Sequence, residues 1–145
     1  MNQHMPNMVA VMTPFPYSIK ETATIADAEK MMEEHNIHHL PVMVDGNIDS
    51  IVSQRDLQRA RLVGHRTQPE EELQVGDISP TRAFFADAND PLDKILDVMA
   101  DKHLGAALIL REGEMVGIFT TYDACRKFSA QLRSTFPPEP EDSVA

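Results

Sequence analysis

Two short segments of this chain place a hydroxyl group and, three residues later, a carboxylate directly after a hydrophobic run. Ser53 and Asp56 form one pair, and Thr120 and Asp123 form the other. At a helix N-terminus, free backbone N–H groups and the helix dipole attract anions, while a carboxylate can accept two hydrogen bonds from a vicinal diol such as ribose. The pattern therefore fits a ligand site. It also fits a purely structural role, with Ser53 and Thr120 as helix N-caps.

The two pairs belong to an internal repeat. An offset of 67 residues superposes Asp56 on Asp123 and Gly46 on Gly113, without a gap between residues 24 and 57. Few residues are identical, but the pattern of apolar and turn residues is retained. This duplication predicts two copies of one folded unit.

Each copy is expected to open with an extended segment, near 17–19 and 83–85, followed by an amphipathic helix. Thr24 is the expected cap in the first copy; in the second, Asp90 is the expected N-cap, Pro91 the first helical residue and Asp93 the capping-box carboxylate. Apolar residues at helical spacing predict a buried stripe on each helix. These residues are Ile25, Ala28 and Met32 in copy one, and Leu92, Ile95, Leu96 and Met99 in copy two.

A hairpin and a second helix complete each unit. Residues 40–44 and 48–52 flank an Asp45-Gly46 turn, and residues 107–110 and 115–119 flank Glu112-Gly113. The second helices are expected to begin around Asp56 and Asp123. The predicted fold is α/β (α+β), made of two β-α-β-β-α units that form one pair.

The chain divides into five parts. We expect a flexible N-terminal arm at 1–8, whose Met residues pack on the domain, repeat 1 at 9–63 and repeat 2 at 75–132. The Gly-, Pro- and Glu-containing stretch 64–74 is the predicted linker. The Pro- and acid-rich segment 133–145 is the predicted disordered acidic tail.

Composition narrows the possible partners. The formal net charge is −10, which opposes binding to nucleic acid or to an anionic membrane surface, because both need a basic face. No run of 18 apolar residues occurs, so no membrane span is predicted. Cys125 is the single cysteine; we expect it to be buried on a helix, in a chain suited to the reducing cytoplasm.

Several motifs together resemble paired CBS domains. The resemblance covers roughly residues 9–132, and its motifs are weak singly but specific in their order and duplication. It rests on a closing hydrophobic-hydrophobic-Ser/Thr-x-x-Asp pattern, a hairpin opening and a leading segment. These are Ile51-Val52-Ser53-Gln54-Arg55-Asp56, Gly117-Ile118-Phe119-Thr120-Thr121-Tyr122-Asp123, Leu40-Pro41-Val42, Val11-Met12-Thr13-Pro14 and Val75-Gly76-Asp77-Ile78-Ser79-Pro80.

The resemblance implies tandem CBS repeats packed sheet to sheet as a pseudo-two-fold pair with two related clefts, and a disc-shaped homodimer of such pairs. Members bind AMP, ADP, ATP, S-adenosylmethionine or related compounds, and some bind no known ligand. By analogy, Asp56 and Asp123 would hold ribose hydroxyls, and Ser53 and Thr120 would lie near ribose or phosphate. His38 and His39 would line a cleft, because they directly precede Leu40-Pro41.

The two copies differ at these positions. Copy two has Gly105 and Ala106 where copy one has His38 and His39, so we expect unequal affinity in the two clefts. Arg55, with the two histidines, is the main candidate for phosphate, and Lys20, Arg82 and Arg126 are more distant candidates. Thr121 and Tyr122 complete the candidate set; Tyr122 either stacks on a base or packs on the core. Adjacent histidines in a strand point to opposite faces, so no metal site is predicted.

The leading hypothesis is a regulatory module that senses an adenosyl compound and acts on a protein partner that the sequence does not identify. The alternative is a structural dimerisation scaffold that binds no nucleotide. No catalytic motif and no required cofactor is indicated, so we do not expect an enzyme; a small enzyme using Asp56 or Asp123 as a base is the third and weakest hypothesis.

Overall fold

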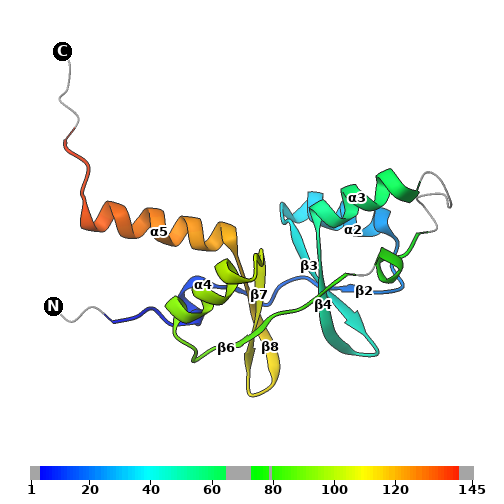
Figure 1. Cartoon of the computed structure of the whole chain (residues 1–145), viewed down its shortest axis with the longest axis horizontal. Coiled ribbons are helices and arrows are strands. Elements are labelled where there is room, and N and C mark those ends of the chain that lie inside the picture. The colour runs from blue at the N-terminus through cyan, green and yellow to red at the C-terminus, as the bar shows by residue number, and fades with distance from the viewer. Residues whose placement is uncertain (1–3, 65–72, 79, 141–145) are drawn as a thin grey trace, which may run out of the picture.

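The computed structural model describes residues 4–64, 73–78 and 80–140, which form an α+β fold with two four-stranded sheets. The first sheet has the order β2 (Ile19–Lys20), β3 (His39–Val44), β4 (Asn47–Ser53) and β5 (Thr81–Arg82). The second has the order β1 (Thr13–Pro14), β8 (Glu114–Thr120), β7 (Ala106–Arg111) and β6 (Phe85–Asp87). Figure 1 shows the two units side by side, with α2 (Ile25–His35) and α3 (Gln54–Gly64) in one and α4 (Leu92–Asp101) and α5 (Thr121–Thr135) in the other.

The first helix of copy one begins as predicted. The Thr24 hydroxyl accepts a hydrogen bond from the Asp27 backbone N–H at 3.0 Å, and the Asp27 carboxylate accepts one from the Thr24 N–H at 3.2 Å. This capping box satisfies two backbone donors that a helix N-terminus leaves free. The predicted apolar stripe, Ile25, Ala28 and Met32, is buried.

The predicted cap of α4 is wrong. Pro91 occupies the N-cap position and makes no side-chain hydrogen bond, so the helix begins at Leu92. The Asp90 carboxylate instead accepts a hydrogen bond from the backbone N–H of Asp87, at 2.9 Å. Asp90 therefore stabilises the turn before the helix, and Asp93 forms no capping box. The apolar stripe itself is confirmed, because Leu92, Ile95 and Met99 are buried and Leu96 is half-buried.

The hairpins follow the sequence repeat in detail. Asp45 and Gly46 have φ of 49° and 83°, and Glu112 and Gly113 have φ of 51° and 81°. Positive φ at both central residues defines the type I′ turn, whose twist matches that of the two strands. Each hairpin also has a bulge at the equivalent place, after Val42 and after Ile109.

The two repeats exchange their leading strands. β1 precedes copy one but pairs with β8 of copy two, whereas β5 precedes copy two but pairs with β4 of copy one. A third core cluster lies between the sheets and includes Ile51, Leu108 and Ile118. The exchanged strands and this shared core hold the two repeats sheet to sheet. Each sheet therefore contains one strand from the segment that precedes the other repeat.

Several predicted boundaries shift. Met8, at the end of the predicted arm, begins the short helix α1 (Met8–Val11), so the arm ends earlier than predicted. Its side chain is fully buried in the copy-two core, which fits the expectation that Met residues of the arm pack on the domain. Val75 is likewise fully buried at the start of the matching 3₁₀ helix η1 (Val75–Ile78). α5 continues to Thr135, three residues into the predicted tail. Cys125 is exposed, so its predicted burial is wrong, because the helix that carries it buries no residue. Residues 1–3, 65–72 and 141–145 of the arm, linker and tail lie outside the described residues.

Candidate functional site: a cleft between the repeats

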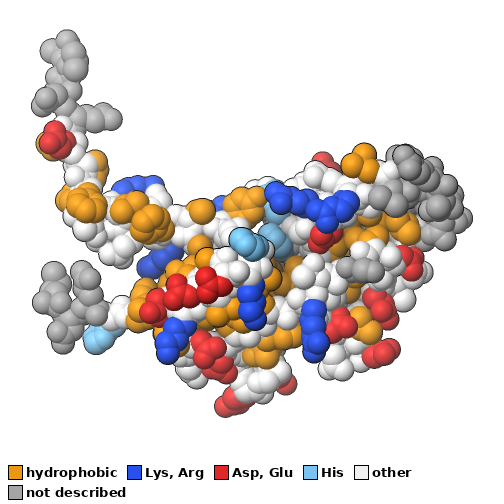
Figure 2. Space-filling view, viewed as in Figure 1, with side chains coloured by type: hydrophobic (Ala, Val, Ile, Leu, Met, Phe, Trp, Pro, Cys, Tyr) orange, Lys and Arg blue, Asp and Glu red, His pale blue; other side chains and the backbone are white. Residues whose placement is uncertain are grey.

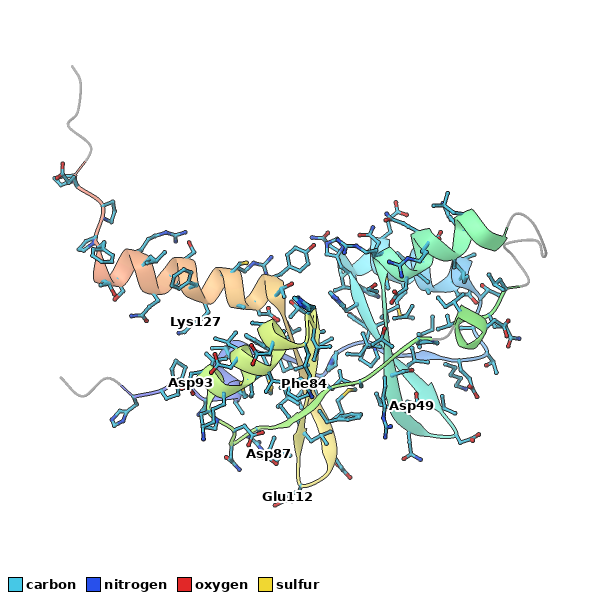
Figure 3. The ribbon with its side chains drawn as sticks, in the orientation of Figure 1. Asp49, Phe84, Asp87, Asp93, Glu112 and Lys127 are labelled. Atoms are coloured by element: carbon cyan, nitrogen blue, oxygen red, sulfur yellow. The ribbon has the colours of Figure 1, made fainter. Side chains whose placement is uncertain are left out.

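A cavity of about 700 Å³ opens between the two repeats. Copy one contributes the end of β4 and the start of α3; copy two contributes α4 and the N-terminal ends of β7 and α5. Residues 81–84 run between them, and Figure 3 labels Phe84 on this segment. The lining includes His38, His39, Ser53, Gln54, Arg55, Asp56, Gln58, Arg82, Phe84, His103, Gly105, Ala106, Thr121 and Tyr122.

Ser53 and Asp56 form a capping box at the wall of this cavity. The Asp56 N–H donates to Ser53 Oγ at 3.1 Å, and the Ser53 N–H donates to Asp56 Oδ2 at 2.8 Å. The structural role considered from the sequence is thus confirmed. Among the described residues, no donor binds Asp56 Oδ1. This oxygen and the Ser53 hydroxyl proton are available to a ligand in the cavity.

The matching pair in copy two makes the same capping box and one further bond between its own members. Asp123 Oδ2 accepts the Thr120 N–H at 2.9 Å and lies 3.2 Å from the Thr120 hydroxyl, which is placed to donate to it. Neither residue lines the cavity between the repeats. The two copies of one motif therefore differ: the copy-one pair faces the cavity, and the copy-two pair caps α5.

His39 reaches across the interface to copy two. A Cβ atom added at Gly105 would lie 3.0 Å from His39 Nε2, so the imidazole occupies the space that a side chain at 105 would need. Burial lowers the pKa of His39 below its usual 6.5, the nearby His38 lowers it further, and Asp56 partly offsets both effects. The histidine of copy one and the glycine of copy two are thus complementary parts of one wall.

His38 makes the second bridge between the repeats. Its Nδ1 lies 2.8 Å from Gln54 Oε1, so the Nδ1–H tautomer donates this hydrogen bond. Its ring lies against Tyr122 of α5, with ring centroids 5.0 Å apart and planes 31° from parallel. The side chains of 38 and 39 make different contacts, as the strand alternation predicts.

The cavity is locally basic in an acidic chain. Two arginines and three histidines line it, against the one carboxylate of Asp56. Figure 2 shows histidine side chains at the centre of the face where the two halves meet, with Lys and Arg side chains nearby. The arrangement suits a ligand with a diol for Asp56 and an anionic group for the cations. Among the described residues, no three His, Cys, Asp or Glu side chains are grouped to hold a metal ion.

Nine of the eleven predicted site residues line this cavity: His38, His39, Ser53, Arg55, Asp56, Gly105, Ala106, Thr121 and Tyr122. Thr120 and Asp123 do not. Of the more distant phosphate candidates, Arg82 lines it and Lys20 and Arg126 do not. Phe84 and His103 were missed, because their approach depends on how the repeats pack and leaves no motif in the sequence.

The fold and the cleft define a module of two paired repeats, with the cavity at the interface between them. Residues 9–63 and 75–130 each match the CBS domain, so the chain belongs to the CBS domain family. It is similar to Hypoxic response protein 1 of Mycobacterium tuberculosis, with 25% identity over 74% of this chain and 75% of that protein. No helix within residues 4–64, 73–78 or 80–140 has the length and hydropathy of a transmembrane span.

Solved structures agree on the fold. The chain is similar to AcuB of Vibrio cholerae, with a TM-score of 0.76, 25% identity and coverage of 94% of this chain and 100% of that one. It is also similar to the CBS domain pair of protein MJ0100, with a TM-score of 0.72, 22% identity and coverage of 88% and 99%. That protein was solved in complex with 5′-methylthioadenosine and S-adenosyl-L-methionine.

Proposed function

We propose that this protein is a non-catalytic regulatory module that binds one adenosyl compound per chain in the cavity beside Asp56. The observation that carries the proposal is the joining of a free carboxylate oxygen, five basic side chains and an exposed tyrosine around about 700 Å³. This volume lies within the usual range for small-molecule sites, about 300–1,000 Å³. The complex of the MJ0100 domain pair supports the ligand class.

Each part of such a ligand has a counterpart in the cavity. A ribose diol would bind Asp56 Oδ1 and the Ser53 hydroxyl, since both residues line the cavity. Arg55 and Arg82 would neutralise a phosphate, which suits AMP or ADP better than an adenosyl sulfonium. Tyr122 and Phe84 offer surfaces against which a base can stack. Binding would regulate a partner protein by fixing the relative positions of the two repeats that share the cavity.

The scaffold hypothesis has an observation of its own. Both Ser/Thr-x-x-Asp motifs make complete capping boxes, so the motif is explained without any ligand. The two hypotheses predict different effects of removing the Asp56 carboxylate. Under the scaffold hypothesis, the change removes only a helix cap and lowers the free energy of unfolding by about 1 kcal/mol.

The test is the shift in thermal unfolding produced by AMP, ADP, ATP and S-adenosylmethionine. A ligand at 100 times its Kd stabilises the folded state by about 2.7 kcal/mol. Asp56→Ala should abolish that shift. Asp27→Ala is the matched control, because Asp27 makes the same capping box on α2 and does not line the cavity; it should keep the shift, as should Asp123→Ala. No shift with any ligand would favour the scaffold, whereas equal losses in all three variants would contradict the assignment of the ligand site to Asp56.

A further inference from the structure

A second cavity, of about 380 Å³, lies in copy one where β3 and β4 meet η1 and β5. Val42 and Ser50, which pair across β3 and β4, are its buried residues. Glu21, Asp49 and Arg82 are its charged residues, and Figure 3 labels Asp49 on β4. The volume is large enough for a small metabolite, since small-molecule sites begin at about 300 Å³.

The Ser50 hydroxyl is a buried polar group without a protein partner. The residue is 8% exposed, and no group of residues 4–64, 73–78 or 80–140 forms a hydrogen bond with its hydroxyl. A hydroxyl removed from water without a replacement hydrogen bond destabilises the folded state. The Ser50 oxygen is not sealed inside the core, so a molecule in the second cavity can supply the missing bond.

The charged side chains of the second cavity are not paired with one another. Within the part of the chain that the structure describes, Glu21, Asp49 and Arg82 form no ion pair. Glu21 is held beside η1, because its carbonyl accepts the Gly76 N–H at 2.9 Å and its side chain lies over the bare Cα of Gly76. Two free carboxylates and one free guanidinium therefore border the same space.

Copy two fills the matching space with its own chain. Gly117 stands where copy one has Ser50, and a Cβ atom added at Gly117 would overlap the Met12 side chain. The charged positions are apolar there too. The repeat offset and the strand register match Glu21, Asp49 and Arg82 with Ala88, Val116 and Pro14. A packed apolar solution thus exists within the same fold, so the polar second cavity is a specific feature of copy one.

We propose that the second cavity binds a dibasic α-amino acid of the lysine or ornithine type. The ligand's carboxylate binds Arg82 and the Ser50 hydroxyl. Its two ammonium groups bind Glu21 and Asp49, and its methylene chain lies on Val42. Both signs of charge then balance, since two cations meet two carboxylates and one anion meets the guanidinium. A simple anion or a simple cation would leave protein charges of one sign unpaired.

Arg82 is the one residue that lines both cavities. A guanidinium has five N–H donors, so it can bind a phosphate on one side and a carboxylate on the other. The amino-acid site does not otherwise depend on the nucleotide. The decisive variants therefore change residues that line the second cavity alone.

The first test is isothermal titration calorimetry of the full chain with L-lysine and L-ornithine. At least one of them should bind saturably, at one site per chain. L-Norleucine lacks the side-chain ammonium of lysine and cadaverine lacks its carboxylate, so each loses a charge-assisted hydrogen bond and should bind at least about 10-fold more weakly than L-lysine. Absence of saturable binding of both amino acids at millimolar concentrations would overturn the proposal. Equal binding of all the compounds would overturn it as well.

The second test removes one carboxylate at a time without changing its size. Glu21→Gln and Asp49→Asn should each weaken binding at least about 10-fold. Asp45→Asn is the matched control, because Asp45 is an exposed carboxylate of the same hairpin that does not line the second cavity; it should leave binding unchanged. If all three variants lost affinity equally, the binding would be a general attraction of cations to an acidic chain, and the proposal would fall.

The same variants keep this proposal separate from the nucleotide proposal. Asp56→Ala should retain amino-acid binding, because Asp56 lines the first cavity alone. Asp49→Asn should retain the thermal shift with nucleotide. Loss of amino-acid binding in Asp56→Ala would overturn the assignment to the second cavity, whereas absence of a nucleotide shift would leave that assignment standing.

Discussion

The second helices of the two repeats begin alike but are held in place differently. Both α3 and α5 start with a Ser/Thr-x-x-Asp capping box. α3 is then anchored by Leu57, which is fully buried, whereas the matching residue of α5 is Ala124, half-buried at the edge of its core cluster. The comparison shows that both copies of the duplicated unit keep the capping motif that starts the helix. The buried residue that anchors the helix and the side chains on its exposed face differ between the copies. Both copies line the cavity between the repeats, but only the Ser/Thr-x-x-Asp pair of copy one faces it, and the outer face of α5 stays exposed.

Loss of the α3 anchor should have the largest effect on stability. Leu57→Ala removes a fully buried side chain from the core of copy one and should lower the free energy of unfolding by about 3 kcal/mol. Leu62→Ala, at an exposed position of the same helix, should change it by less than about 0.5 kcal/mol. Chemical denaturation measures both. If the two variants were equally stable, Leu57 would not be the anchor.

Met8 tests whether α1 is a structural part of copy two, as η1 is of copy one. Met8→Ala should cost about 2 kcal/mol, because the side chain is fully buried in the copy-two core. Met5→Ala, at an exposed position in the same N-terminal segment, is the control and should be close to neutral. A neutral Met8→Ala would return this segment to the mobile arm that the sequence suggested.

The contact between His39 and Gly105 tests how the two copies complement each other. Gly105→Ala places a methyl group 3.0 Å from His39 Nε2 and should cost about 1–2 kcal/mol through overpacking. In a His39→Ala background the same change should cost almost nothing, since the crowding group is gone. A double-mutant cycle by denaturation gives the coupling energy. Additive effects would mean that the two residues do not touch in solution.

The smallest effect is a pH dependence from the same histidine. Because the pKa of His39 is lowered on folding, the unfolded chain binds its proton more readily. Above pH 6.5 His39 is neutral in both the folded and the unfolded chain and does not lower the free energy of unfolding. As the pH falls from 6.5 towards the folded-state pKa, the unfolded chain takes up the proton first, so the free energy of unfolding decreases. One proton gives a slope of at most about 1.4 kcal/mol per pH unit. His39→Gln should flatten the stability profile just below pH 6.5 relative to wild type; identical slopes would contradict the assignment.

Interactions between neighbours in the sequence were predictable. The type I′ turns at Asp45-Gly46 and Glu112-Gly113, the helix stripes and the Ser/Thr-x-x-Asp caps all join residues a few positions apart. The predicted cap of α4 is nevertheless wrong. The Asp90 carboxylate lies near backbone donors both at the start of α4 and in the preceding turn, and it accepts its hydrogen bond from the Asp87 N–H in that turn. Local patterns name the candidates, but competition between partners within reach decides which bond forms.

The sequence by itself determined the two units, their internal order and the residue types that each brings to its β4–α3 or β8–α5 junction. Only the tertiary structure decided that β1 and β5 exchange sheets, that Asp56 faces the cavity while Asp123 does not, and that His39 lies over Gly105. The reason is range. Hydrogen bonds and turns within a few residues are encoded by neighbours, whereas the exchange and the cavity depend on a core shared by Ile51, Leu108 and Ile118, which lie far apart in the chain.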